Sequence, residues 1–459
     1  MRRAWLAASL LVGGCLMGPD YKRPEVPAPA DYRGATAGTA GASIADKDWV
    51  EVFPDPTLHE LIRTALRQNR DVAIAAARIE QAQAQLGITR ADQLPQLNIG
   101  LAAGRERVAA GLAPANTTNL FQAQASASWA LDFWGKFRRA SEAARADLLS
   151  SEWNRRAVIA TLVANVASAY YQLLALDLEL EISKSTLASR RESLGLTQLQ
   201  ESHGTVSILD VRQAEQLLYT ATETIIDVER RTEQEENLIN VLLGQNPGPV
   251  PRGRRLIEQP HDAVIPAGLP SALLARRPDI QVQEARLIAA NARIGVARAA
   301  YFPSISLTGG GGFQSADLGD LLNGSSGFWS IIGSLTQTIF DGGRIKAGVK
   351  LAEAQKKELL FTYQQTIFEA FREVSDALVG YRKLREFREQ QELLTKSAQD
   401  ASAISEQRYR GGAASYLEVL DANTRAFTAE LNLAQAQLNE LLSLVQLYSA
   451  LGGGWQSAG

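Results

Sequence analysis

Residues 121–131 read FQAQASASWAL, and apolar residues occupy every second position of this stretch. In a β-strand, such alternation gathers the apolar side chains on one face and the polar ones on the other. Three other stretches alternate similarly, and aromatic residues lie near the ends of all but the one at 95–106, which is typical of transmembrane strands. An ordinary soluble sheet with one wet face is the alternative interpretation. We predict four strands, at about residues 95–106, 119–132, 303–314 and 328–340.

A long tract without proline follows each pair of predicted strands. In the first tract Ile159, Val166 and Leu173 recur every seven residues, and other apolar residues fill the positions between them. This spacing of three and four is typical of a coiled-coil seam. About 65 residues at 1.5 Å each make a rod of roughly 100 Å, which must project and pack against neighbours. We predict two long helical hairpins, at residues 136–244 and 344–450.

The turn of each predicted hairpin contains glycine, which supplies the left-handed conformation that a tight helix exit needs. Ser207 and Ser415 follow the two turns, and each has an acidic residue three positions further on. That spacing is typical of a capping box, so we expect both serines to cap the returning helices. The turn glycines are Gly204 in the first hairpin and Gly411 and Gly412 in the second.

The chain repeats itself at a fixed offset of 208 residues, so that Pro95 corresponds to Pro303 and Gly204 to Gly412. A shared offset over so long a stretch indicates two copies of one unit, each with a helix, two strands and a long helical hairpin. Prolines between the copies indicate an irregular connector. The predicted boundaries are 57–248 for the first repeat, 249–265 for the connector and 266–459 for the second repeat with its C-terminal tail.

The N-terminal residues 1–14 contain two arginines, an apolar run and two glycines, and they precede Cys15, the one cysteine of the chain. This pattern is typical of a lipoprotein signal peptide, whose cleavage would leave Cys15 as a lipid-bearing first residue. Ordinary signal cleavage, or a free thiol, is the alternative. Prolines recur in the polar stretch that follows, so we predict an extended, lipidated tether at residues 15–56.

Composition argues against several functions. The formal net charge of -3 provides no field that would attract nucleic acid. The three histidines are far apart and show neither metal-ligand spacing nor a Ser/His/Asp grouping. The glycine run at 309–312 lies within a strand pattern and lacks the Gly-Lys-Ser/Thr of a phosphate loop, so close strand packing explains it better. We expect no enzyme activity, metal, other cofactor or nucleic-acid partner.

No tract after the signal reads as apolar over the roughly 18 residues that a spanning helix needs, so strands are expected to cross the membrane. Four strands cannot close a barrel, since about eight is the practical minimum. Their edges must therefore pair with other copies of the chain. Two copies would give eight strands and three would give twelve, and these arguments leave the choice open. A coiled-coil scaffold without a channel would explain the heptads, but neither the strands nor the signal.

Six motifs together resemble those of the TolC-like outer-membrane factors, in particular the OprM/NodT-type outer membrane efflux lipoproteins. The resemblance extends over essentially the whole mature chain. The motifs are GPDYKRP at 18–24, LDFWGK at 131–136, FDGGR at 340–344, RYRG at 408–411, YLEVLDA at 416–422 and ALGGGW at 450–455.

The resemblance implies a mixed α and β membrane protein that assembles as a homotrimer. Four strands per chain would form a 12-stranded transmembrane β-barrel, continuous with a long periplasmic α-helical coiled-coil barrel. The protein would lie in the outer membrane, lipid-anchored, and extend into the periplasm. It would be a passive, gated duct for small molecules such as drugs, supplied by an inner-membrane RND-type pump and a periplasmic adaptor (membrane fusion) protein. A type I secretion duct or a metal-efflux duct is the alternative.

The resemblance also places a periplasmic gate at the second hairpin. In the family, rings of leucine and aspartate close the tunnel, and arginine and tyrosine contacts hold it closed. The matching positions are Leu417 and Asp421 for the rings, and Arg408, Tyr409 and Arg410 for the holding contacts. Three aspartates on a narrow axis would repel anions and attract cations.

Overall fold

The computed structural model describes residues 16–34, 43–108, 116–260 and 265–456. They fall into two compact units, which are considered separately below. The first unit contains residues up to 25 together with 77–152 and 282–364, and the second contains 26–76, 153–281 and 365 onwards. Cys15 and the signal residues 1–14 lie outside the described residues, so the predicted lipid attachment remains a prediction.

The main elements occur twice in the same order: a helix, two strands and two long helices. The first set is α4 (Arg70–Ala91), β1 (Gln96–Val108), β2 (Asn116–Leu131), α5 (Lys136–Ser202) and α6 (Ile208–Leu242). The second set is α8 (Pro278–Ala299), β3 (Ser304–Ser315), β4 (Gly327–Thr336), α9 (Arg344–Arg410) and α10 (Tyr416–Ala450). The shorter helices are η1 (Ile44–Asp46), α2 (Trp49–Val52), α3 (Pro56–Gln68), η2 (Leu256–Glu258), α7 (Pro270–Arg276), η3 (Leu318–Asp320) and η4 (Gly324–Ser326).

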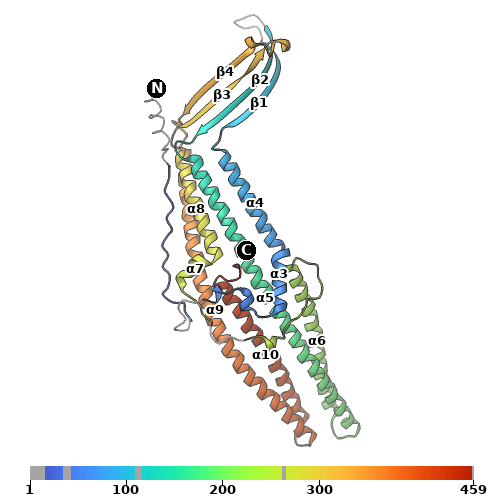
Figure 1. Ribbon diagram of the computed structural model, residues 1–459. Coiled ribbons are helices and arrows are strands. Elements are labelled where there is room, and N and C mark those ends of the chain that lie inside the picture. The colour runs from blue at the N-terminus through green and yellow to red at the C-terminus, as the bar shows by residue number, and fades with distance from the viewer. Residues whose placement is uncertain (1–15, 35–42, 109–115, 261–264, 457–459) are drawn as a thin grey trace. The chain divides into compact units, whose positions relative to one another are not determined.

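In the first unit the four strands form one antiparallel sheet in the order β1-β2-β3-β4 (Figure 1). Residues that stand directly opposite each other in antiparallel strands share a face of the sheet. Ile99 pairs with Ala125, Ala125 with Gly311 and Gly311 with Trp329. The register therefore brings the apolar positions of all four strands onto one face, which we call the apolar face. It includes Leu97, Ile99, Leu101, Phe121, Trp129, Ile305, Leu307, Phe313, Trp329, Ile331 and Leu335.

The opposite face of the sheet is mainly polar. Asn98 pairs with Ser126, Ser126 with Gly310 and Gly310 with Ser330. Gln, Ser and Thr side chains supply most of the remaining positions, although the large apolar side chains Leu120, Phe328 and Ile332 interrupt them. The outer edges of β1 and β4 have no partner strand among the described residues. Each chain thus carries an open, two-faced sheet with two unpaired edges.

The glycine run in β3 lets neighbouring strands approach closely. A Cβ atom built on Gly312 would lie 2.1 Å from the backbone oxygen of Ala123, which no real side chain tolerates. This contact is the physical reason for glycine at the position, and it agrees with the expected packing role.

The strand boundaries differ most from prediction at β4, which ends at Thr336 instead of 340. Ile339 and Phe340, at the predicted end of the strand, are exposed and lie outside it. The carboxylate of Asp341 accepts the backbone N–H groups of Gly343 and Ile345, at 2.8 and 2.7 Å, at the beginning of α9. The sheet therefore ends before the turn that starts α9, although apolar residues continue up to that turn.

The predicted tether is extended only in part. Residues 20–29 have no regular secondary structure, but residues 43–56 form η1, α2 and the beginning of α3 in the second unit. Trp49 and Phe53 are buried there, and the hydroxyl of Tyr448 donates to the backbone oxygen of Lys47 at 2.9 Å. The prediction of a tether over 15–56 is wrong for its second half, because these aromatic side chains bury themselves against the helices.

In the first unit the GPDYKRP motif is held against helices by specific contacts. Arg139 on α5 donates to the backbone oxygen of Met17 and pairs with Asp20, at 3.1 and 2.7 Å. Arg23 pairs with Glu284 on α8 at 2.8 Å. A Cβ on Gly18 would lie 2.5 Å from the Cα of Gly295, so the strap, as we call residues 17–24, touches α8 backbone to backbone. The motif therefore fixes the strap to α5 and α8.

In the second unit the connector at 249–260 is anchored by the fully buried Asp55. Its carboxylate accepts the hydroxyl of Tyr170 on α5 at 2.9 Å and the backbone N–H of Arg254 at 3.0 Å. Gln259 donates to the same carboxylate at 3.2 Å. Because several donors satisfy the buried charge, this connector is irregular but ordered.

One described helix, α5, is long enough and, in one window, apolar enough to cross a membrane by those criteria alone. The expectation that no such tract follows the signal is therefore wrong. Of that window, 61% is buried inside the structure, as in a helix of a protein core. Val166 and Tyr170, for example, are completely buried.

Candidate functional site at the hairpin tips

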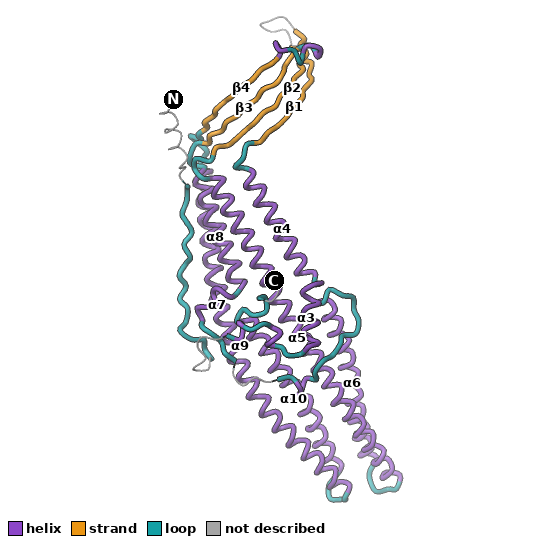
Figure 2. The backbone as a smooth tube through the Cα atoms, in the orientation of Figure 1, coloured by secondary structure: helices purple, strands orange, loops and turns teal. Residues whose placement is uncertain are grey.

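Short loops at 203–207 and 411–415 join α5 to α6 and α9 to α10, and both tips belong to the second unit (Figure 2). Gly204 and Gly412 have φ values of 74° and 72°, which is the left-handed conformation expected of the turn glycines. Gly411 does not have a positive φ. Gly411 lies in the predicted turn, but only Gly412 is left-handed there, because one left-handed residue is enough to end the helix.

The two returning helices begin differently. Ser207 forms a full capping box: its hydroxyl accepts the N–H of Leu209 at 3.0 Å, and Asp210 accepts the N–H of Ser207 at 3.0 Å. The side chain of Ser415 makes no capping hydrogen bond within the described chain. The carboxylate of Glu418 instead pairs with Arg408 on α9 at 3.3 Å. The predicted second cap is therefore wrong, because an ion pair across the hairpin engages its acidic residue.

This difference predicts different effects of removing the two serines. Ser207→Ala should weaken the first turn of α6 by about 1 kcal/mol, because it leaves a helix N–H group without its cap. Amide hydrogen exchange of that turn, followed by mass spectrometry, should speed up roughly fivefold. Ser415→Ala is the matched control and should leave exchange at the start of α10 unchanged. Equal effects of the two substitutions would contradict the assignment.

Tyr409 joins the second hairpin to α5. Its hydroxyl donates to Oε1 of Gln200 at 2.9 Å, and its ring stacks edge-on against Tyr416 with centroids 5.4 Å apart. Burial raises the pKa of Tyr409, so the hydroxyl remains a neutral donor. Tyr416 belongs to an apolar cluster with buried residues of α5, α6 and α10: Leu194, Val211, Ala214 and Val419.

The two predicted arginines make different contacts. Besides its pair with Glu418, Arg408 donates to the backbone oxygen of Ala413 at 3.3 Å, within the turn itself. Arg410 reaches Glu406 of its own helix at 3.9 Å, with both side chains exposed. An exposed pair of that length contributes little to stability. Within one chain, Arg408 therefore links α9 to the turn and to α10, and Tyr409 links α9 to α5. Among the described residues, Arg410 contacts only its own helix.

Leu417 and Asp421 lie one helical turn apart near the start of α10, so their side chains share a face of that helix. Leu417 is 60% exposed and is not part of the packed seam. Asp421 is exposed and pairs with Arg425, one turn further along, at 2.8 Å. Both side chains are therefore available to other molecules at this tip.

The sequence analysis did not identify the residues that contact three of the predicted gate residues. These are Gln200 for Tyr409, Glu418 for Arg408 and Arg425 for Asp421. The spacing of Asp421 and Arg425 is that of a helical ion pair and could have been found from the sequence. Gln200 is 209 residues away from Tyr409 along the chain, and nothing local to either residue indicates their contact.

Comparison with known proteins gives the family. The family described as "Outer membrane efflux protein" matches residues 61–245 and 269–453. The toluene efflux pump outer membrane protein TtgC of Pseudomonas putida is 38% identical over 456 residues, covering 97% of this chain and 94% of that protein. The cation efflux system protein CusC of Escherichia coli O157:H7 is 36% identical over 459 residues, covering 98% and 97%.

A solved structure shows the same fold. The open state of the Neisseria gonorrhoeae MtrE outer membrane channel superposes with a TM-score of 0.88 at 31% identity, covering 96% of this chain and 99% of that one. These similarities place the chain among outer-membrane channel proteins. More narrowly, it belongs to the outer membrane efflux protein family. It is therefore located in the outer membrane and extends into the periplasm, and it serves efflux as a channel component.

Proposed function

We propose that three copies of the chain assemble into a passive, gated duct. Their three sheets would close into a 12-stranded barrel, and the helical hairpins would form a periplasmic tunnel. The observation that carries the proposal is the open sheet, which has one apolar face and, within the described parts of the chain, no partner strand at the outer edges of β1 and β4. In lipid an unpaired edge is not tolerated, so each edge must pair with a neighbouring copy. The apolar face would contact lipid and the mainly polar face would line the lumen.

Two internal repeats are part of the proposal. The segments that match the family begin at 61 and 269 and end at 245 and 453, so both boundaries differ by 208 residues. This is the offset found in the sequence, and it supports one duplicated unit.

A passive duct needs an energised partner, and we place this chain in a tripartite assembly with a periplasmic adaptor and an inner-membrane RND-type pump. The exposed hairpin tips, where Leu417 and Asp421 lie, would form the gate that faces this assembly. Relatives named for toluene, antibiotic and cation efflux favour small molecules as the cargo, and the cation efflux protein CusC keeps a metal-efflux duct as the second candidate. The identity of the pump that co-purifies with the protein after cross-linking would distinguish a duct for small organic molecules from a metal-efflux duct.

The assembly is tested directly by the mass and conductance of the purified protein. Light scattering in a non-ionic detergent should give the mass of three chains, and planar bilayers should show discrete channel currents. A monomer that is stable in buffer without detergent and gives no currents would contradict the proposal.

Cys15→Ala should weaken membrane attachment during assembly without abolishing the channel, because lipid on Cys15 assists insertion whereas the barrel provides the permanent anchor. Pulse-labelling with membrane fractionation should show a larger transient soluble pool, and the same final trimer in the outer membrane. A variant that forms no trimer would contradict this division of roles.

A further inference from the structure

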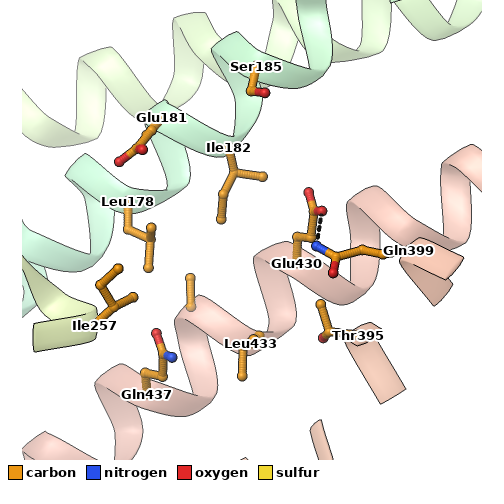
Figure 3. A pocket seen from close by; sticks show the side chains of 11 residues that line it. Leu178, Glu181, Ile182, Ser185, Ile257, Thr395, Gln399, Glu430, Leu433 and Gln437 are labelled. Atoms are coloured by element: carbon orange, nitrogen blue, oxygen red, sulfur yellow. Dashed lines mark hydrogen bonds between the residues drawn. The ribbon is translucent and has the colours of Figure 1, made fainter. Parts of the chain in front are cut away.

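The second unit contains a pocket that the proposed duct does not use. It has a volume of about 300 Å³ and lies between α5, α9, α10 and the short helix η2 (Figure 3). Such a volume is at the lower end of the range of small-molecule sites. The apolar part of its wall comes from Leu178, Ile182, Ile257 and Leu433.

The polar part of the wall is built by α9 and α10. Gln437 is 8% exposed and lines the pocket, and its Oε1 has no hydrogen-bond partner in the described chain. Glu430, two helical turns before it on α10, accepts a hydrogen bond from the amide of Gln399 at 2.6 Å (Figure 3). The Gln437 oxygen is covered by surrounding atoms, so the carboxylate of Glu430 is the acceptor that can meet a charged ligand.

The charges of the pocket favour a cation. Its only ionisable lining residues are Glu181 and Glu430, and the described lining contains no basic side chain. Arg255 pairs with Glu181 and compensates that carboxylate. The hydrogen bond to Glu430 comes from a neutral amide, so one negative charge remains at the pocket wall.

The combination selects one chemical class. A bare metal ion would need several oxygen ligands, and no group of three or more acidic, histidine or cysteine side chains that could hold one occurs among the described residues. Four aliphatic side chains instead offer a surface for a hydrocarbon body. We propose that this pocket binds a small organic cation, in which a primary ammonium on a short hydrocarbon chain meets Glu430 while the chain lies against the aliphatic wall.

The test uses hexylammonium as the probe, with hexanol and hexanoate as neutral and anionic analogues of similar size. Ligand-observed NMR with the full-length protein in a non-ionic detergent should show saturable binding of hexylammonium, with a Kd near about 1 mM, as expected for so few atoms. Both analogues should bind at least about fivefold more weakly, since they lack the charge-assisted hydrogen bond. Equal binding of the three compounds would overturn the proposal.

Three variants distinguish binding in the pocket from two other sources of a binding signal, namely attraction to surface charge and uptake of the probe into detergent micelles. Glu430→Gln should weaken hexylammonium binding about tenfold. Ser185→Trp, at an exposed position of the pocket lining, should weaken it by obstruction. Glu223→Gln removes the same charge from an exposed position of α6 and should change nothing. Binding unaffected by Glu430→Gln or by Ser185→Trp, or weakened as much by Glu223→Gln, would contradict the proposal.

Discussion

Replacing Ile331 with arginine is expected to prevent stable insertion of the protein into the outer membrane. Ile331 lies at the centre of β4, on the apolar face, and is 71% exposed in a single chain. An arginine at the lipid face near the bilayer midplane costs roughly 2–4 kcal/mol, and three copies would add to about 6–12 kcal/mol per trimer. Such a loss is of the order of the whole stability of an ordinary domain.

The adjacent residue supplies the matched control. Ser330 lies on the opposite face of the same strand, where it pairs with Gly310. Ser330→Arg introduces the same side chain on the proposed lumen face, so trimer yield should remain near that of the unmodified protein while single-channel conductance changes. The measurement is the amount of trimer in outer-membrane fractions. If Ile331→Arg assembles normally, or if Ser330→Arg fails equally, the proposed assignment of the two faces is wrong.

Asp421→Ala is expected to loosen the closed state of the channel. If three copies of Asp421 form a ring, they create a barrier to anions that alanine removes. The cost to the hairpin itself should be small, because the pair with Arg425 is exposed and contributes about 0.3–0.5 kcal/mol. Single-channel recordings in planar bilayers should show a larger current in the closed state, with weaker cation preference.

Arg425→Gln distinguishes a ring from a simple helix pair. It breaks the same ion pair but leaves the carboxylate of Asp421 in place, so the closed-state current should stay low. An unchanged current in Asp421→Ala would remove Asp421 from the gate. Equal leaks in the two variants would show that the helical ion pair, and not a ring, controls closure.

Much of this fold was predictable because its signals are local. Alternation in residues 121–131 depends only on the two-residue period of a strand, and β2 (Asn116–Leu131) contains the whole stretch. The absence of proline and the seven-residue spacing likewise predicted long helices, and the structure has α5 and α9 there, with 67 residues each. Prediction fails where a local signal is ambiguous: the apolar residues Ile339 and Phe340 lie beyond the end of β4. The spacing of Ser415 and Glu418 resembles a cap, but Glu418 pairs with Arg408 instead.

The sequence by itself determined the four strands and the four long helices of the two hairpins, and its fixed offset indicates two copies of one unit. Only the tertiary structure decided which positions of different strands share a face, because β2 and β3 are brought into register across the intervening long hairpin. It likewise decided that Tyr409 meets Gln200 and that Glu430 and Gln437 line one pocket with Ile182. Periodicity reports the conformation of neighbours along the chain, whereas these contacts depend on how distant segments pack.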